Sequence, residues 1–330
     1  MLYALINAIV GQVCLSVDAR FALPENLNKD VDVNRVSPSI WSRLLAEISL
    51  YNNVQDSNYV LCFGNLPPLF KLRGYTVLFL QNRYLIEENS LRDFPLKIRF
   101  RLYIERFWIR RRLANVDKFV VQTPTMKRLL EAKFKRITSI QVLPFVAESK
   151  GYVRGFQNFN INPSSIFDFV YVASGEPHKN HRCLIEAWRL LAGEGLYPSL
   201  CLTVDEGRFP EVCYLINEMR QMYGVRIFNM GTLAHLDILG IYGNSRAVIY
   251  PSKFESFGLP LIEARQAGLP VIASELDFVR DVLDPEQVFD ANSPISIARA
   301  VKRFLGKPES PLPLLDAAQF LAAIGEKDFL

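Results

Sequence analysis

The 330-residue sequence has five cysteines, three histidines and no apolar run of the roughly 20 residues that a membrane-spanning helix needs. The cysteines are odd in number and scattered, without a CxxC pair, at Cys14, Cys62, Cys183, Cys201 and Cys213. This pattern is typical of a reducing compartment. Low-complexity tracts and fixed-period repeats are also absent. These absences exclude a disulfide scaffold, a zinc ribbon, an integral membrane protein and a repeat array.

The histidines, His178, His181 and His235, all lie in the second half, and no carboxylate or thiol is spaced to complete a metal cage. We therefore expect no metal. The first seventeen residues are apolar, but they lack a basic region and a small-residue cleavage site, so we expect no secretory signal.

Charge divides the chain sharply. Residues 1–160 hold 23 Lys and Arg against 13 Asp and Glu, or +10, and residues 161–330 hold 15 against 21, or −6, which together give the net +4. Such asymmetry indicates that an anionic surface meets the first half only. Nucleic acid is not expected, because no aromatic platform or binding motif accompanies the charge.

Strand-like and helical segments alternate in both halves, which predicts an α/β protein with parallel sheets covered by helices. In the first half we expect helices at 3–10, 38–50, 96–114 and 125–134, and strands at 13–17, 59–63, 76–81, 117–122 and 139–143. In the second half we expect strands at 167–173, 200–204, 225–229, 247–250 and 270–273, and helices at 182–191, 211–222, 234–242, 261–267 and 294–305.

The predicted boundaries are an N-terminal Rossmann-like domain at 1–150, a linker at 151–165, a second domain at 166–307 and a C-terminal segment at 308–330. That last segment holds a helical pattern, Leu314–Ala323, and is a candidate to pack back on the first domain. The chain opens on a helical pattern where a doubly wound domain usually opens on a strand and a Gly-rich turn. Either the first unit is trimmed or the start lies downstream of a longer natural one.

The segment FESFGLPLIEA, from Phe254 to Ala264, places two carboxylates, Glu255 and Glu263, eight positions apart. A strand-like run leads in and a helical pattern leads out. Pro260 suits a first helical turn, and Gly258 lets the backbone approach a ligand closely. Helix N-termini favour anions, so this unit predicts a site for a phosphorylated ligand. The structural alternative is a glutamate that merely complements the helix dipole.

Two ordered motifs, FVYVASGEPHKNHRCLIEAW and the run from Met230 to Ser274, resemble the donor-binding domain of glycosyltransferase family 4. The resemblance implies a GT-B fold of two Rossmann-like doubly wound domains facing across a cleft. It also implies a retaining, metal-independent enzyme that uses a nucleotide-diphosphate sugar and no cofactor. The first half resembles, less specifically, the acceptor domains of bacterial enzymes that build O-antigens, capsules and exopolysaccharides.

Carried over by position, Glu263 binds the donor ribose and Glu255 lies near the transferred sugar. Lys179 neutralises the diphosphate leaving group, which is physically sensible because departure generates negative charge. The loop groups expected to contact sugar and diphosphate are Ser256, Phe257, Gly258 and Leu259.

The sequence also departs from the family pattern. Ala173 and Ser174 stand where Gly-Arg is usual, and Arg182 is a candidate replacement for the missing cation. The first half has no histidine to approach the donor sugar, so Gln81, Asn82 and Arg83 are candidates for that place. His178 is expected to be a loop polar group rather than a general base.

The segment Pro95–Arg112 carries seven basic residues and one acidic residue, interleaved with aromatics at helical spacing. One interpretation is a core-packed helix with a solvated basic face. The other is an interfacial helix, Leu96–Arg112, that binds the anionic inner face of the cytoplasmic membrane.

The sequence thus predicts a cytoplasmic, peripherally membrane-bound glycosyltransferase acting on a surface glycan, with a lipid-linked glycan as the expected acceptor. One alternative is a GT-B phosphorylase or nucleotide-sugar epimerase. Another is a truncated or inactive protein that binds a nucleotide sugar or a partner enzyme.

Overall fold

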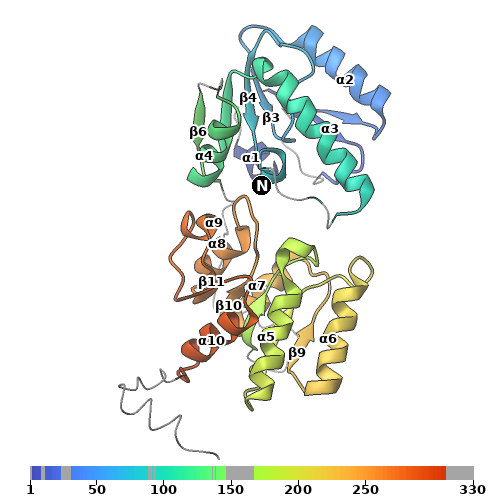
Figure 1. The fold of residues 1–330 in the computed structure, drawn as a ribbon. Helices are drawn as coiled ribbons and strands as arrows, with labels where there is room; N and C mark the ends of the chain where they lie inside the picture. The colour runs from blue at the N-terminus through green and yellow to red at the C-terminus, as the bar shows by residue number, and fades with distance from the viewer. Residues whose placement is uncertain are drawn as a thin grey trace, which may run out of the picture.

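The computed structural model describes residues 2–8, 12–23, 31–87, 91, 94–135, 137, 139–145 and 167–309. Figure 1 shows two lobes, an N-terminal lobe in blue to green and a C-terminal lobe in yellow-green to red. The expected linker at 151–165 and the helix expected at Leu314–Ala323 lie outside the described residues.

The C-terminal lobe is built on a six-stranded parallel sheet in the order β12-β11-β10-β7-β8-β9. Its inner strands β7, β8 and β11 are almost fully buried, as expected when helices cover both faces of a parallel sheet, while the edge strands β9 and β12 are only partly buried. The strands are β7 (Phe167–Tyr171), β8 (Leu200–Leu202), β9 (Ile227–Asn229), β10 (Ser245–Tyr250), β11 (Val271–Ser274) and β12 (Gln287–Phe289).

Helices connect these strands, and several begin at sequence signals that are physically clear. Ser293 caps the last helix by accepting a hydrogen bond from the backbone N–H of Ser296 at 3.1 Å, with Pro294 at the first position. The helices are α5 (His181–Gly193), α6 (Pro210–Tyr223), α7 (His235–Gly243), α8 (Leu259–Gln266), α9 (Asp277–Arg280) and α10 (Pro294–Phe304).

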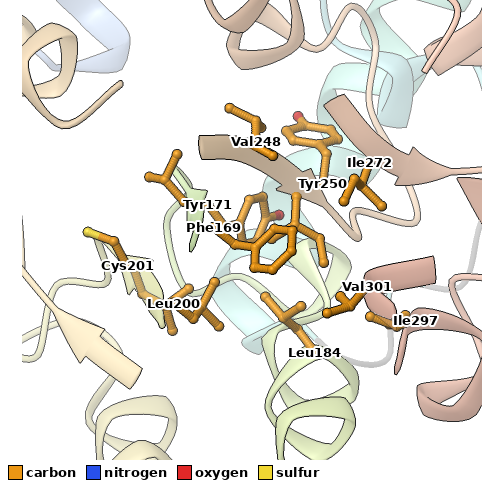
Figure 2. Close-up of a cluster of buried hydrophobic side chains, with 14 of the residues drawn as sticks. Phe169, Tyr171, Leu184, Leu200, Cys201, Val248, Tyr250, Ile272, Ile297 and Val301 are labelled. Atoms are coloured by element: carbon orange, nitrogen blue, oxygen red, sulfur yellow. The ribbon is translucent and has the colours of Figure 1, made fainter. Parts of the chain in front are cut away.

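The core of this lobe joins the sheet to α5 and α10. Figure 2 shows Phe169 and Tyr250 from the strands above Leu184 of α5 and Val301 of α10. Trp188 is fully buried and donates its indole N–H to the carbonyl of Pro198 at 2.8 Å. A large apolar core of this kind gives the site loops a rigid base.

The described strands of the N-terminal lobe form two parallel sheets, a pair β1-β2 and a four-stranded sheet β3-β4-β5-β6. The strands are β1 (Val13–Asp18), β2 (Val31–Val36), β3 (Tyr59–Cys62), β4 (Tyr75–Phe79), β5 (Lys118–Val121) and β6 (Ile140–Val142). The helices are α1 (Leu2–Ala8), α2 (Ile40–Asn53), α3 (Leu96–Arg112) and α4 (Pro124–Lys133), with short 3₁₀ turns at Arg83–Leu85 and Leu113–Asn115. A third such turn, Pro177–Lys179, follows β7 in the C-terminal lobe.

The predicted alternation is confirmed, and each expected element that falls within the described residues is present with small shifts at its ends. Three elements were not predicted. Strand β2 mixes Asp, Asn and Arg with valines, while α9 and β12 are only four and three residues long. The described first-half strands form two separate sheets, a division that the alternation of elements did not predict.

The four-stranded and the six-stranded sheet both direct carboxyl ends of their strands toward the region between the lobes, where residues that follow β3, β4, β7 and β10 line one cavity. In the C-terminal sheet the chain runs from β7 outward to β8 and β9, then returns to β10 beside β7 and continues to β11 and β12. Ligands of doubly wound sheets bind at such a reversal of strand order. The loops after β7 and β10 are therefore the expected place for a site.

Candidate active site

The loop between β10 and α8 contains the two-glutamate segment. Gly258 has φ 74°, a left-handed conformation, and an added Cβ would lie 3.0 Å from Cδ1 of Leu261. Phe254 and Phe257 are buried and anchor the loop on both sides of Glu255. The strand, loop and helix predicted for this segment are confirmed, and a glycine is required at their junction.

One carboxylate oxygen of Glu255 is held by three donors. Its Oε1 accepts hydrogen bonds from Lys179 Nζ at 2.6 Å, from Ser252 Oγ at 2.7 Å and from the Tyr250 hydroxyl at 3.1 Å. Charge-assisted bonds of this kind fix a carboxylate strongly. No described residue donates a hydrogen bond to Oε2, so the second oxygen is available to a ligand.

Lys179 and Glu255 form a largely buried ion pair, with only 17% and 13% of their side chains exposed. Lys179 ends the turn Pro177–Lys179, and its carbonyl accepts a hydrogen bond from the Tyr171 hydroxyl at 2.9 Å. Burial, together with the Glu255 charge, raises the pKa of Tyr171 and of Tyr250 well above the ordinary value. Both phenols are therefore neutral donors at physiological pH.

Asn180 ties the loop after β7 to the loop after β10. Its φ is 64°, and its side-chain amide donates to the carbonyls of Pro251 at 3.0 Å and Ala291 at 2.7 Å. The backbone N–H of Lys253 adds a bond to the His178 carbonyl at 2.8 Å. The Lys179–Glu255 pair is thus fixed by the backbone of two neighbouring strand ends.

A cavity of about 260 Å³ opens beside this pair, between the two lobes. Its lining residues come from the strand ends of both lobes: Asn65, Gln81, Asn82, Arg83, Tyr84, His178, Phe254, Glu255 and Ser256. The structure therefore gathers five predicted residues, Gln81, Asn82, Arg83, Glu255 and Ser256, around one hollow.

Arg83 bridges the lobes at the edge of this cavity. Its NH1 donates to the backbone carbonyl of Glu255 at 3.1 Å, and its Cζ lies 4.5 Å from the centroid of the Phe254 ring. Tyr84 also contacts that ring, with centroids 4.4 Å apart. Arg83 forms a further ion pair with Glu87, so its guanidinium is engaged on several sides.

The N-terminal wall is held in place by Asn65 and Arg106. Asn65 has φ 65°, and its Oδ1 accepts from the backbone N–H groups of Gln81 at 2.6 Å and Asn82 at 2.9 Å. From α3, Arg106 donates to the carbonyls of Tyr84 at 2.8 Å and Glu87 at 2.9 Å. Sequence reasoning missed Asn65 and Tyr84, because neither lies in a recognisable motif.

His178 also lines the cavity, although the sequence had suggested only a loop polar group. Its ring packs against Tyr84, with centroids 5.8 Å apart. Its buried Nδ1 has no hydrogen-bond partner among the described residues. Burial lowers the pKa of His178 by more than the Glu255 charge raises it, so the imidazole is neutral at pH 7. That His178 does not act as a general base stays a prediction.

Glu263 lies within α8, close to the helix start, and is partly buried. The Tyr242 hydroxyl donates to its Oε2 at 3.4 Å, and burial raises the pKa of the carboxyl. Arg182, in contrast, is exposed and lies 3.2 Å from the Glu211 carboxylate. Neither residue lines the 260 Å³ cavity. Phe257, Gly258 and Leu259 form the end of the loop and the first residue of α8.

The described residues offer neither a metal-binding cluster nor a membrane-spanning helix. No three His, Cys, Asp or Glu side chains gather there as a possible metal site. Within the same ranges, none of the helices combines the length and the apolar character that crossing a bilayer requires.

Comparisons with known proteins point to one family. Residues 157–319 match the family described as Glycosyl transferases group 1. The serotype-specific mannosyltransferase WbdA of Escherichia coli is 30% identical over 138 residues, which is 42% of this chain and 17% of that protein. The O-antigen chain mannosyltransferase B of Escherichia coli is 32% identical over 139 residues, 41% of this chain and 36% of that protein. The matches thus span well under half of these relatives.

Solved structures extend the likeness to both lobes. Sucrose-phosphate synthase from Thermosynechococcus elongatus aligns with a TM-score of 0.66 at 16% identity, covering 89% of this chain and 79% of that one. HepE from Anabaena, solved with UDP and glucose, aligns at 0.56 and 13% identity, covering 83% and 76%. Likeness of this extent shows the fold, which is GT-B, with two Rossmann-like domains facing each other.

Proposed function

Residues 157–319 match the Glycosyl transferases group 1 family, and from that premise we propose the reaction of this chain. It transfers a sugar from a nucleotide-diphosphate sugar to a surface-glycan acceptor with retention of configuration. The observation that carries the proposal is the buried Lys179–Glu255 pair, which lies at a reversal of strand order beside a cavity between two lobes. Such a position suits a reaction that must exclude water.

In this proposal the transferred sugar occupies the 260 Å³ cavity. Oε2 of Glu255 accepts a hydrogen bond from a sugar hydroxyl, and the side-chain amides of Gln81 and Asn82 supply polar contacts from the opposite lobe. Polyhydroxylated ligands need such convergent donors and acceptors. Ser256 and the backbone of the loop complete the C-terminal side.

The diphosphate is proposed to lie against Lys179 and the start of α8. The bond between the anomeric carbon and the diphosphate oxygen breaks, and negative charge develops on that oxygen. A fixed ammonium and a helix N-terminus stabilise this charge without having to reorganise. The departing oxygen takes the proton of the acceptor hydroxyl, which attacks from the same face and retains the configuration. No step requires a metal.

Glu263 is proposed to bind the ribose hydroxyls, one helical turn from the diphosphate. Its surroundings fit a polar ligand group, because the carboxyl is partly buried and, among the described residues, Tyr242 at 3.4 Å is its one hydrogen-bond donor. Phe257, Gly258 and Leu259 present the loop backbone to the same ligand. Arg182 serves the diphosphate in this scheme only if it leaves Glu211, its partner in the structure.

The acceptor is proposed to be lipid-linked, and the protein to work at the inner face of the cytoplasmic membrane. The support is the exposure of the α3 aromatics: Phe100, Tyr103 and Phe107 face solvent, while Leu102 and Ile109 fill the core. A core-packed aromatic stripe would have been buried. Exposed aromatics beside arginines favour the headgroup region of an anionic bilayer.

Thermal shift with a panel of nucleotide sugars, followed by product analysis, tests the proposal. The donor that raises the melting temperature most is incubated with lipid-linked acceptors, and the anomeric configuration of the product is read by nuclear magnetic resonance. A retained configuration supports the proposal. An inverted product, or release of an epimerised donor, contradicts it.

A nucleotide-sugar-binding protein without activity is the second candidate. One observation favours it: the Ser174 hydroxyl bonds to the Glu176 carboxylate where the family usually has an arginine. A neutral hydroxyl beside a carboxylate therefore stands where the family usually has a cation. Donor binding without turnover on any acceptor, or without slow donor hydrolysis, would identify this candidate.

A further inference from the structure

The outer face of the N-terminal lobe carries an apolar stripe on α3. Leu96, Phe100, Tyr103 and Phe107 are all exposed, Phe100 by 69% and Phe107 by 60%. Helical residues spaced by three or four share one face. On the neighbouring α2, Trp41 is 76% exposed and Leu45 is exposed as well. The two helices lie side by side (Figure 1), with the Arg43 guanidinium of α2 lying 4.9 Å from the centroid of the Trp108 ring.

A second cavity, of about 370 Å³, lies at the C-terminal end of this stripe. It is separate from the candidate active site, and its volume falls in the range of small-ligand pockets. It is lined by four apolar side chains and two arginines: Leu69, Ile104, Phe107, Trp108, Arg111 and Arg112.

The wall facing α3 is a loop whose three consecutive residues are each fixed by a different element. Trp108 Nε1 of α3 donates to the carbonyl of Pro67 at 2.9 Å. Asn115 Nδ2, in the turn after α3, donates to the carbonyl of Pro68 at 2.8 Å. The backbone N–H of Leu69 donates to Glu47 Oε2 of α2 at 2.9 Å. Because three elements hold this wall, the cavity is formed before any ligand arrives.

The charged side of the cavity is cationic. No carboxylate among the described residues pairs with Arg111 or Arg112, although other α3 residues such as Arg101 do have one. Arg111 Cζ lies 5.0 Å from the centroid of the Phe107 ring, which places its charge directly beside the apolar stripe. An aromatic wall beside two arginines that no described carboxylate neutralises matches a molecule with a hydrocarbon chain and an anionic head.

We propose that this cavity binds one lipid phosphate, with the chain against Ile104, Phe107 and Trp108 and the phosphate at Arg111 and Arg112. The shared chemistry is a phosphate with an attached hydrocarbon chain, as in an anionic phospholipid or an isoprenoid phosphate. Binding stands on the geometry of this cavity alone. Its use, to bring a lipid-linked acceptor to the inter-lobe cavity, rests on the proposed function.

The experiment uses the full chain carrying Trp41→Phe, so that Trp108 reports on the cavity while Trp188 stays buried in the other lobe. The probes are dihexanoyl phosphatidic acid below its micelle concentration, glycerol phosphate, and dihexanoylglycerol. Of these three probes, we expect only the phosphatidic acid to shift the Trp108 emission to a saturating value. Farnesyl phosphate is titrated in the same way to represent an isoprenoid phosphate. Whichever of the two lipid phosphates binds more tightly identifies the class of lipid that the cavity takes.

Three variants separate a site from a diffuse basic surface. Arg111→Ser and Arg112→Ser are each expected to weaken binding about fivefold, the effect of one basic residue near an anionic lipid. Phe107→Ser is expected to weaken it through the lost chain contact. Arg110→Ser is the matched control, because Arg110 lies in the same turn and does not line the cavity. It is expected to leave the affinity unchanged.

Three results would overturn the proposal: saturation by glycerol phosphate alone, saturation by dihexanoylglycerol alone, or equal losses in Arg110→Ser and Arg111→Ser. Binding is measured without a sugar donor. A failure here therefore leaves the transferase proposal intact, and a protein that binds the lipid but transfers no sugar would have lost only the proposed function.

Discussion

The ammonium group of Lys179 lies 2.6 Å from Oε1 of Glu255, and the two side chains come from loops that follow adjacent strands of the same sheet. Ser252 and Tyr250 bond to the same oxygen. The lysine is thereby held in one place, and in the proposed function it meets the diphosphate while the other carboxylate oxygen accepts a hydrogen bond from a sugar hydroxyl. The same ion pair therefore orients the proposed diphosphate ligand, Lys179, and the proposed sugar ligand, Glu255.

Replacing Lys179 with Met is expected to lower stability and activity together. The change leaves a largely buried carboxylate without its cation, which costs about 3 kcal/mol of the free energy of unfolding. It also removes the proposed stabilisation of the leaving group, and we expect turnover to fall roughly a hundredfold. Urea unfolding and single-turnover transfer measure the two effects.

The control is the double variant Lys179→Met with Glu255→Gln. Because both charges are then gone, we expect most of the lost unfolding free energy to return while turnover stays low. A double variant no more stable than Lys179→Met would show that the pair has little energetic coupling.

The sequence identified this pair by family resemblance, but it did not show how the pair is held. Lys179 and Glu255 are 76 positions apart, and their contact depends on β7 and β10 being neighbours, which follows from a reversal of strand order. Tyr250 and Ser252 looked like the end of a strand and a loop. Their role appears only once the carboxylate is seen to turn back toward them.

Glu263 gives a pH-dependent prediction. Burial raises its pKa in the folded protein, so its contribution to stability is fully present below the ordinary value of 4.5 and is lost as pH rises through the folded-state pKa. Glu263→Gln stays neutral throughout. We therefore expect the variant to become progressively more stable than the parent as pH rises from 4 toward 7.

The same substitution is expected to abolish the donor-induced rise in melting temperature if Glu263 binds ribose. Denaturation curves at several pH values, with and without donor, measure both effects. A variant that gains stability and still responds fully to the donor would refute the ribose role while upholding the effect of burial.

Gly258→Ala tests the loop geometry. Gly258 has φ 74°, and a new Cβ would lie 3.0 Å from Leu261 Cδ1, so we expect a loss of about 1–2 kcal/mol of unfolding free energy and weaker donor binding. Gly268→Ala is the matched control. That residue has φ 71° with no atom within 4 Å of the added Cβ, so it reports the backbone strain alone. Equal losses at both sites would mean that the Leu261 contact has no effect.

The sequence predicted less of the site in the N-terminal lobe than in the C-terminal lobe. Gln81, Asn82 and Arg83 were expected near the sugar because of their place after a strand, and the structure puts them around the cavity. Asn65, which orders two of their backbone N–H groups, is 16 positions away, in a loop rich in Gly and Pro. Local pattern cannot reveal a contact that depends on β3 lying next to β4. The spacing of the α3 aromatics likewise could not show whether they are exposed, because residues on a buried helix face and on a solvent-facing one recur with the same period.

Arg83→Ala tests the bridge between the lobes. The guanidinium donates to the Glu255 carbonyl and stacks on Phe254, two contacts that together contribute about 2 kcal/mol. Without them we expect the lobes to separate more often, which small-angle scattering reads as a larger radius of gyration without donor. Because an open cleft admits water, donor hydrolysis should rise relative to transfer.

Arg128→Ala is the control, since its pairing with Asp277 at 3.7 Å also joins the lobes but is exposed and contributes little. Arg83→Lys keeps the charge but loses the planar stacking on Phe254. We therefore expect its radius of gyration to lie between those of the parent and of Arg83→Ala. An unchanged ratio of hydrolysis to transfer in Arg83→Ala would show that Arg83 contacts the loop without controlling closure.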